Sequence, residues 1–170
     1  MSLIEKLKEL EKKELIDLIV DVSKLRNENE EFLKLKISSM DTMYFVLKIY
    51  KQKIDMFFKS DTLILKEFRL IISDFKKINN EDKFLNDIMV YSIEHAILYT
   101  KDNGDLIESH YTYFEGMFQK CVDFLIKNRE FILLYKPRLE KVVKESHNGF
   151  GHYDIYAQMI TKLEGVNQSL

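Results

Sequence analysis

Cysteine, proline and tryptophan are nearly missing from this chain of 170 residues, which has one cysteine, one proline and no tryptophan. A single cysteine, Cys121, cannot form a disulfide within the chain, so a disulfide-stapled secreted domain is excluded. The N-terminus also starts directly with a polar, helix-forming segment and lacks the basic and apolar regions of a signal peptide. We therefore expect a cytoplasmic protein.

Long apolar runs and an excess of one charge are missing too. No run approaches the roughly 18 apolar residues that cross a bilayer, so we expect no membrane span. The 26 basic and 28 acidic side chains are interspersed and give a formal net charge of -2. Nucleic-acid binders concentrate Lys and Arg in a patch that neutralises phosphates. We therefore expect no nucleic-acid partner.

The short motifs that mark common catalytic sites do not occur in the sequence. It has no phosphate loop, no dinucleotide-binding glycine fingerprint, no nucleophile elbow, no two-histidine zinc helix and no C-x-x-C pair. A di-iron bundle needs Glu and His three residues apart, whereas Glu108 precedes His110 by two and Glu94 precedes His95 by one. We predict no metal and no cofactor, and a non-enzymatic protein is favoured over an enzyme.

What the chain does contain is typical of packed helices. Hydrophobic residues make up 46% and charged residues 32%, and the apolar residues recur at helical spacing along nearly the whole length. The length fits one domain. We predict an all-α protein with a single domain over residues 1–170, folded as an antiparallel helical bundle or a short irregular α-solenoid of about eight or nine helices.

Polar breaks predict where several helices begin and end. Ser2 is suited to cap the first helix, and Ser60 or Asp61 the fifth. Gly104 can adopt a left-handed conformation at the end of the sixth helix. The segment from Asp105 to Glu108 has the spacing of a capping box for the seventh helix.

Two residues inside predicted helices need a separate explanation. Pro137 lacks a backbone donor, so residues 129–145 are either kinked there or split into two helices. Gly116 costs about 1 kcal/mol relative to alanine in mid-helix, which favours close helix packing at that position over contact with a substrate.

The C-terminal half, residues 86–170, contains all four histidines and all five glycines of the chain. His95 and His110 lie about equally far from the turn at 102–104 and can face each other, with Tyr113 on the same side as His110. One interpretation is a site for a transition metal or for acid-base chemistry. The favoured alternative is two partly buried histidines, hydrogen-bonded to tyrosines or backbone.

A second candidate site is the loop of residues 146–154 between two helices, which contains His147, Phe150, His152 and Asp154, with a glycine on either side of Phe150. Glycine lets backbone approach a ligand closely. The favoured alternative is a tight turn in which Phe150 fills the core and Asp154 lies at the start of the last helix.

Four segments together resemble a family of small bacterial helical proteins catalogued as a domain of unknown function. They are Leu3–Leu7, Lys13–Ile19, Asn29–Leu33 and Gly149–Asp154. The resemblance covers nearly the whole chain. It implies a bacterial, cytoplasmic, helical fold and carries over no catalytic residues.

Two hypotheses for the function follow. The first is a non-enzymatic interaction module, in which an exposed helix face or groove holds another protein or a second copy of the chain. The second is a protein that binds a small ligand or a metal, or an enzyme, with a histidine-containing site in the C-terminal half.

Overall fold

The computed structural model describes residues 2–36, 40–79, 81–146 and 152–167. Over these residues it contains nine α-helices, one short 3₁₀ helix and no strand, which confirms the all-α class. None of the described helices has the length and apolarity that a bilayer crossing requires. Contacts divide the chain into an N-terminal unit, Met1–Tyr44, and a C-terminal unit, Phe45–Leu170. A single domain over 1–170 stays a prediction.

The N-terminal unit contains three short helices, α1 (Leu3–Glu9), α2 (Lys12–Lys24) and α3 (Asn27–Lys36). Ser2 caps α1 as predicted: its hydroxyl accepts from the Glu5 backbone N–H at 3.3 Å, and its own N–H donates to the Glu5 carboxylate at 2.6 Å. The helices α2 and α3 pack together. At their junction the Asn29 side-chain amide donates to the Val22 carbonyl at 2.8 Å.

This unit has almost no core of its own. Among the residues of 2–36 whose side chains are described, none is buried. Chains of about 40 residues rarely bury enough apolar surface to fold alone. The apolar residues of α1–α3 therefore need a further surface against which to pack.

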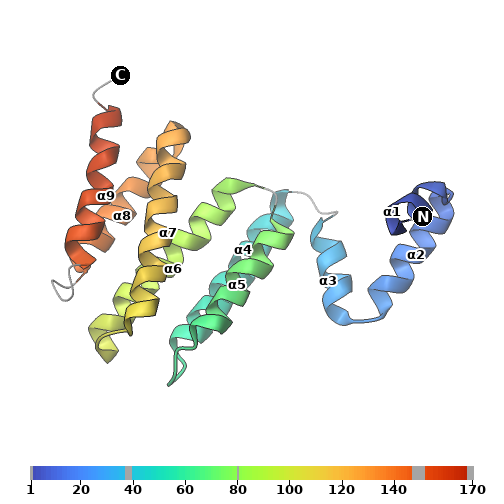
Figure 1. Cartoon of the computed structure of the whole chain (residues 1–170), viewed down its shortest axis with the longest axis horizontal. Coiled ribbons are helices and arrows are strands. Elements are labelled where there is room, and N and C mark those ends of the chain that lie inside the picture. The colour runs from blue at the N-terminus through green and yellow to red at the C-terminus, as the bar shows by residue number, and fades with distance from the viewer. Residues whose placement is uncertain (1, 37–39, 80, 147–151, 168–170) are drawn as a thin grey trace. The chain divides into compact units, whose positions relative to one another are not determined.

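The C-terminal unit contains the larger helices α4 (Met40–Phe58), α5 (Leu65–Ile78), α6 (Asp82–Asn103), α7 (Glu108–Lys127), α8 (Ile132–Glu145) and α9 (His152–Asn167). The first residues of α4 belong to the N-terminal unit. A 3₁₀ turn, Arg129–Phe131, precedes α8. Helix α7 packs against both α6 and α9 (Figure 1). Fully buried aromatic side chains from α5, α7 and α9 fill the core, namely Phe68, Phe75, Phe114, Phe118 and Tyr156.

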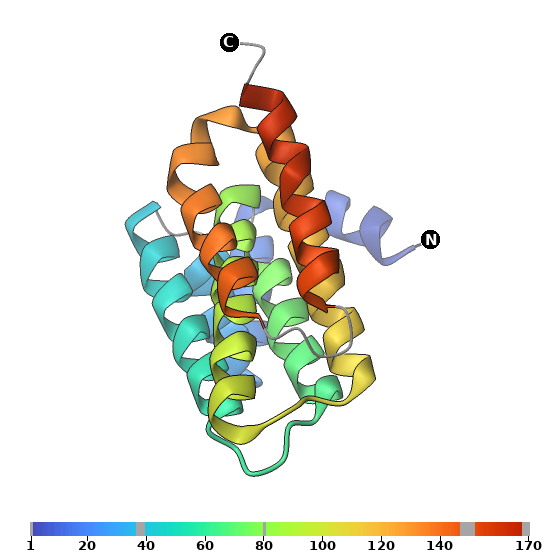
Figure 2. The same cartoon turned by 90° about the vertical axis from the view of Figure 1, so that its left-hand side faces the viewer.

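Helices α4 and α6 run parallel, which positions the candidate site. Contacts between them advance in the same direction along both helices, from Lys51 with Asp87 to Asp55 with Tyr91 and Phe58 with Tyr99. The two views in Figures 1 and 2 show the same direction for both helices. Both C-termini therefore lie at the same end of the unit.

Two predicted helix starts are wrong. Helix α5 begins at Leu65, several residues after Ser60 and Asp61, and no side chain caps it. Helix α7 begins at Glu108 without a side-chain cap, because the Asp105 carboxylate accepts from the Tyr111 hydroxyl at 3.1 Å instead of capping a backbone N–H. The predicted glycine turn is confirmed, since Gly104 ends α6 with φ of 88°.

The residues singled out inside helices have different outcomes. Helix α8 runs through Pro137, which excludes the split there, and the break before α8 is the 3₁₀ turn at 129–131. A kink at Pro137 stays a prediction. Gly116 is not at a close helix contact: it is exposed, and a Cβ built there meets nothing within 4 Å. Its small size therefore serves no packing within the described chain.

Candidate functional site

Polar side chains line the seam between the parallel helices α4 and α6. Lys51 and Asp55 are one turn apart on α4, and Asp87, Tyr91 and His95 follow at four-residue intervals on α6. Residues four apart lie on one face of a helix. The parallel arrangement therefore brings the two rows opposite each other.

Asp55 is the centre of the first cluster in this seam. Its Oδ1 accepts from the Tyr91 hydroxyl at 2.6 Å and lies 2.9 Å from His95 Nε2. The other ring nitrogen of His95, Nδ1, lies 3.2 Å from the Tyr91 carbonyl oxygen. Because both nitrogens face protein oxygen atoms, the imidazole orients Asp55 and leaves no nitrogen free to act on a substrate.

Tyr91 and His95 hold Asp55 through only one of its carboxylate oxygens. Burial raises the pKa of Tyr91, and the hydrogen bond to Asp55 and the nearby negative charges raise it further, so the phenol remains a donor at neutral pH. Asp55 Oδ2 has no hydrogen-bond partner among the described residues. The side chain is one-third exposed, at 33%. Asp55 is thus a fixed carboxylate with one oxygen available to accept.

A second cluster ties α8 to the seam through Arg138. Its Nε and Nη2 donate to the two Glu94 oxygens at 2.8 and 2.6 Å, and its Nη1 donates to Asp87 Oδ1 at 2.8 Å. The Lys51 ammonium contacts the other Asp87 oxygen. Burial acts to lower the pKa of Arg138, but the hydrogen bonds and charges of Glu94 and Asp87 outweigh it and raise that pKa. The cluster links α4, α6 and α8.

A groove of about 350 Å³ opens where α4 and α6 end, within the size range of small-ligand sites. Asp55 and His95 form its inner wall. Two aromatic rings, Phe58 and Tyr99, lie 6.0 Å apart between centroids and face the same space. Asp102 and Lys59 are exposed residues of its lining. The groove therefore combines an oriented carboxylate with aromatic surface.

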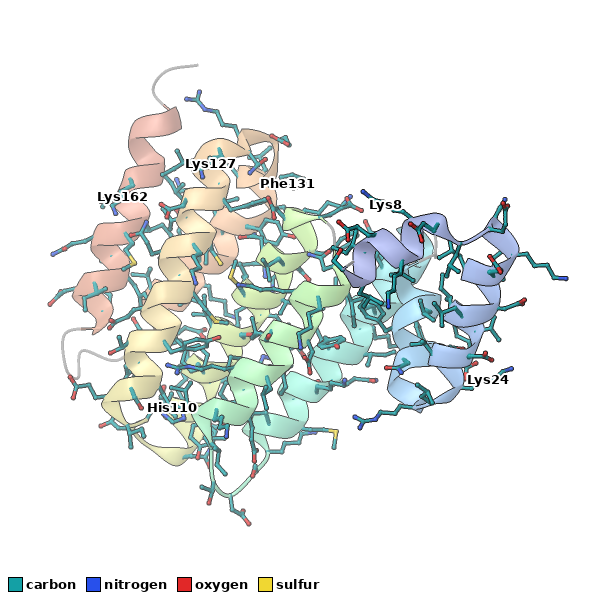
Figure 3. All side chains as sticks on the ribbon, turned by 45° about the vertical axis from the view of Figure 1, so that its right-hand side comes forward. Lys8, Lys24, His110, Lys127, Phe131 and Lys162 are labelled. Carbon is teal, nitrogen blue, oxygen red and sulfur yellow. The ribbon has the colours of Figure 1, made fainter. Side chains whose placement is uncertain are left out.

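His110 lies elsewhere, at the N-terminal end of α7 (Figure 3). It is only 3% exposed. Its Nε2 donates to the Leu63 carbonyl at 3.1 Å, while its Nδ1 has no partner among the described residues. Burial lowers the pKa of His110, the backbone hydrogen bond opposes this, and the Arg69 charge lowers it further. The imidazole is therefore neutral near pH 7.

His95 and His110 do not meet in the contacts that the structure describes. His95 binds Asp55 of α4, whereas His110 binds the loop between α4 and α5. In the described part of the chain, no three His, Cys, Asp or Glu side chains converge as metal ligands. Each imidazole thus has its own oxygen partners and not the other histidine.

The remaining candidates fall into three places. His147 and Phe150 lie outside the described residues, and His152 starts α9. Asp154 is exposed in the first turn of α9. Tyr113 lies on α7 with its ring centroid 5.1 Å from the Arg69 guanidinium. Burial raises the pKa of Tyr113, and the positive charge of Arg69 opposes this only in part. No described contact joins Tyr113 or Asp154 to His95.

Sequence reasoning missed most of the seam. Asp55, Asp87, Glu94 and Arg138 were not among its candidates, because it searched for histidines and for known local motifs. A usable signal was present: the charged positions Asp87 and Glu94 interrupt an α6 that buries ten residues, and buried charges are usually paired.

Comparisons with protein-family models, with curated proteins and with solved structures found no match for this chain. The resemblance to the family of small bacterial helical proteins, and with it a bacterial origin, therefore stays a prediction. The function must be argued from the chain's own surfaces.

Proposed function

We propose that this protein is an interaction module that associates with a second copy of itself through the apolar face of its N-terminal unit. The observation that carries the proposal is the absence of buried side chains among the described side chains of residues 2–36. A unit without buried side chains gains stability chiefly by packing its apolar residues against another surface.

The apolar surface of α2 is wider than one neighbouring helix can cover. At 3.6 residues per turn, its apolar residues occupy more than half of the circumference, with Ile19 near the middle and Asp17 on the opposite side. An amphipathic helix in a globular protein usually has a narrower stripe. Helix α3 packs on α2, yet Ile19 remains 48% and Leu25 76% exposed.

The exposed apolar area is sufficient for a dimer. Nine large apolar side chains between Leu3 and Phe32 are 40–76% exposed. Burying such a side chain completely contributes roughly 1.5–3 kcal/mol, so covering the exposed halves of nine contributes on the order of 10 kcal/mol. In a two-fold dimer each copy covers the other, which doubles the contribution to about 20 kcal/mol. This figure is an upper bound, because it takes the exposed area as fully buried on association. Association costs roughly 4–15 kcal/mol.

Charge is compatible with a second copy and less so with an anionic surface. Helix α2 has three lysines and three acidic residues, so two copies meet without net repulsion. The whole N-terminal unit has eight basic and ten acidic residues. This negative balance disfavours anionic membranes and nucleic acids as partners.

Sedimentation velocity of the full chain over a range of concentrations tests the proposal. We expect a dimer that Ile19→Glu converts to a monomer, because a buried carboxylate opposes association. Asp17→Lys, on the opposite side of α2, is the matched control and should leave the dimer intact.

Other results would overturn the proposal. One such result is a chain that is monomeric at every concentration and still protects the backbone amides of α2 from hydrogen exchange. That result would mean that another part of the same chain covers the apolar face. A dimer that responds equally to Ile19→Glu and Asp17→Lys would place the interface elsewhere.

A further inference from the structure

The groove at the ends of α4 and α6 has a negative potential that the described chain does not fully compensate. Parallel helices present their C-termini together, and each C-terminus is equivalent to roughly half a negative charge. Asp55 and Asp102 add two carboxylates; Lys59 is the one Lys or Arg among the described residues that line this groove, and the lining also includes His95, the partner of Asp55. The Asp102 carboxylate has no ion pair among the described residues. The groove therefore favours a cation.

The aromatic side chains of the groove also favour a cation. The ring of Tyr91 is already used within the chain, by the Lys51 ammonium at 5.1 Å and by the His95 ring at 4.2 Å. Phe58 and Tyr99 are part-exposed and line the groove. Aromatic faces attract ammonium and guanidinium groups within about 6 Å.

Asp55 supplies a counter-ion that is already oriented. The hydroxyl of Tyr91 and the imidazole of His95 hold Oδ1, so the carboxylate cannot turn away and Oδ2 keeps its direction. Preorganisation of this kind reduces the entropy lost on binding. A charged donor that reaches Oδ2 would form a charge-assisted hydrogen bond.

The same residues suit an organic cation better than a metal ion. Structural metal sites need three or four converging ligands, and the described residues offer no such group. An ammonium or guanidinium group needs only one carboxylate and a neighbouring aromatic face.

We propose that the groove between the C-terminal ends of α4 and α6 binds an organic ammonium or guanidinium group, with Asp55 as counter-ion and Phe58 and Tyr99 as aromatic walls. This site is in the C-terminal unit and is independent of the apolar face of the N-terminal unit. The group can belong to a free amine or to the side chain of a peptide, since both present the same chemistry.

Amide chemical shifts of the full chain test this proposal. The probes are putrescine, as a free amine, and a lysine blocked at both ends, as a peptide side chain; 1,4-butanediol is the uncharged control. We expect saturable shifts confined to residues 55–59 and 91–103, with dissociation constants of about 1 mM for ligands of this size. Binding of both amines supports a free-amine site, and binding of the blocked lysine alone supports a peptide site.

Three variants locate the interaction. Asp55→Asn should weaken binding about tenfold or more, as expected for a hydrogen bond to a charged group. Asp102→Asn, at an exposed residue whose side chain has no partner in the described part of the chain, should weaken binding about two- to fivefold without disturbing the fold. Asp82→Asn, at the other end of α6, is the matched control and should change nothing.

The proposal is overturned if neither amine produces saturable shifts, or if butanediol binds as tightly as putrescine. It is also overturned if Asp102→Asn and Asp82→Asn behave alike. Because the exposed Asp102 side chain makes no hydrogen bond or ion pair with the described residues, this comparison holds even where Asp55→Asn disturbs the seam.

Discussion

The cluster around Arg138 allows a quantitative prediction about stability. Arg138→Met retains most of the aliphatic stem and removes a guanidinium that makes three charge-assisted hydrogen bonds to Glu94 and Asp87. Breaking a buried ion pair costs roughly 3–5 kcal/mol because it leaves charges unpaired. Here the side chains retain 13–28% exposure and Asp87 keeps Lys51, so we expect a loss of about 2–4 kcal/mol.

Urea unfolding followed by tyrosine fluorescence measures this loss. Eight of the nine tyrosines lie in the C-terminal unit and the chain has no tryptophan, so the signal reports mainly on that unit. With an m-value of about 2 kcal/mol/M, the midpoint should fall by about 1–2 M. Glu94→Gln in the Arg138→Met background should then cost less than it does in the parent protein, because the two residues are in direct contact.

The matched control is Lys144→Met, an exposed residue on the same helix. It should change the free energy of unfolding by less than about 0.5 kcal/mol. If Arg138→Met and Lys144→Met are equally stable, Arg138 does not link α6 and α8 energetically, and the argument from its hydrogen bonds fails.

Two further predictions concern α7. Gly116→Ala should raise the free energy of unfolding by about 1 kcal/mol, because alanine favours the helix and its methyl group meets no atom within 4 Å; a loss of stability in the same urea assay would contradict the open position. The pKa of His110 is lowered in the folded state, so the unfolded chain binds the proton more tightly and stability should fall as the pH drops below about 6.5. His110→Gln should lose part of this fall between pH 8 and 5, and an identical pH profile for both proteins would show that His110 does not contribute.

Local sequence signals determined part of this fold. The N-cap at Ser2 and the turn at Gly104 depend on residues within a few positions of each other, and both predictions are confirmed. The starts of α5 and α7 were predicted wrongly by the same type of rule. At Asp105 the carboxylate accepts from the Tyr111 hydroxyl, six positions further along the chain, and α7 begins after Ile107 instead; the four residues 105–108 alone do not reveal that alternative.

The candidate site was less accessible to sequence reasoning. His95 was recognised as a candidate, but its partner was sought across the nearest turn, at His110. The actual partner is Asp55, 40 positions away on a helix that is not adjacent in sequence. Side-chain periodicity identifies the face on which His95 lies, whereas the choice of α4 as neighbour depends on how α5 folds back between them.

The parallel direction of α4 and α6 also has a consequence for the order of folding. Two parallel helices cannot be joined by a short turn, so α5 has to return the chain before the seam can close. The contacts of Lys51 with Asp87 and of Asp55 with Tyr91 each join residues 36 positions apart, and closing long loops costs entropy that local helix formation does not. The seam should therefore assemble late, after its helices have formed, and collapsed intermediates would contain the helices of this protein without its groove.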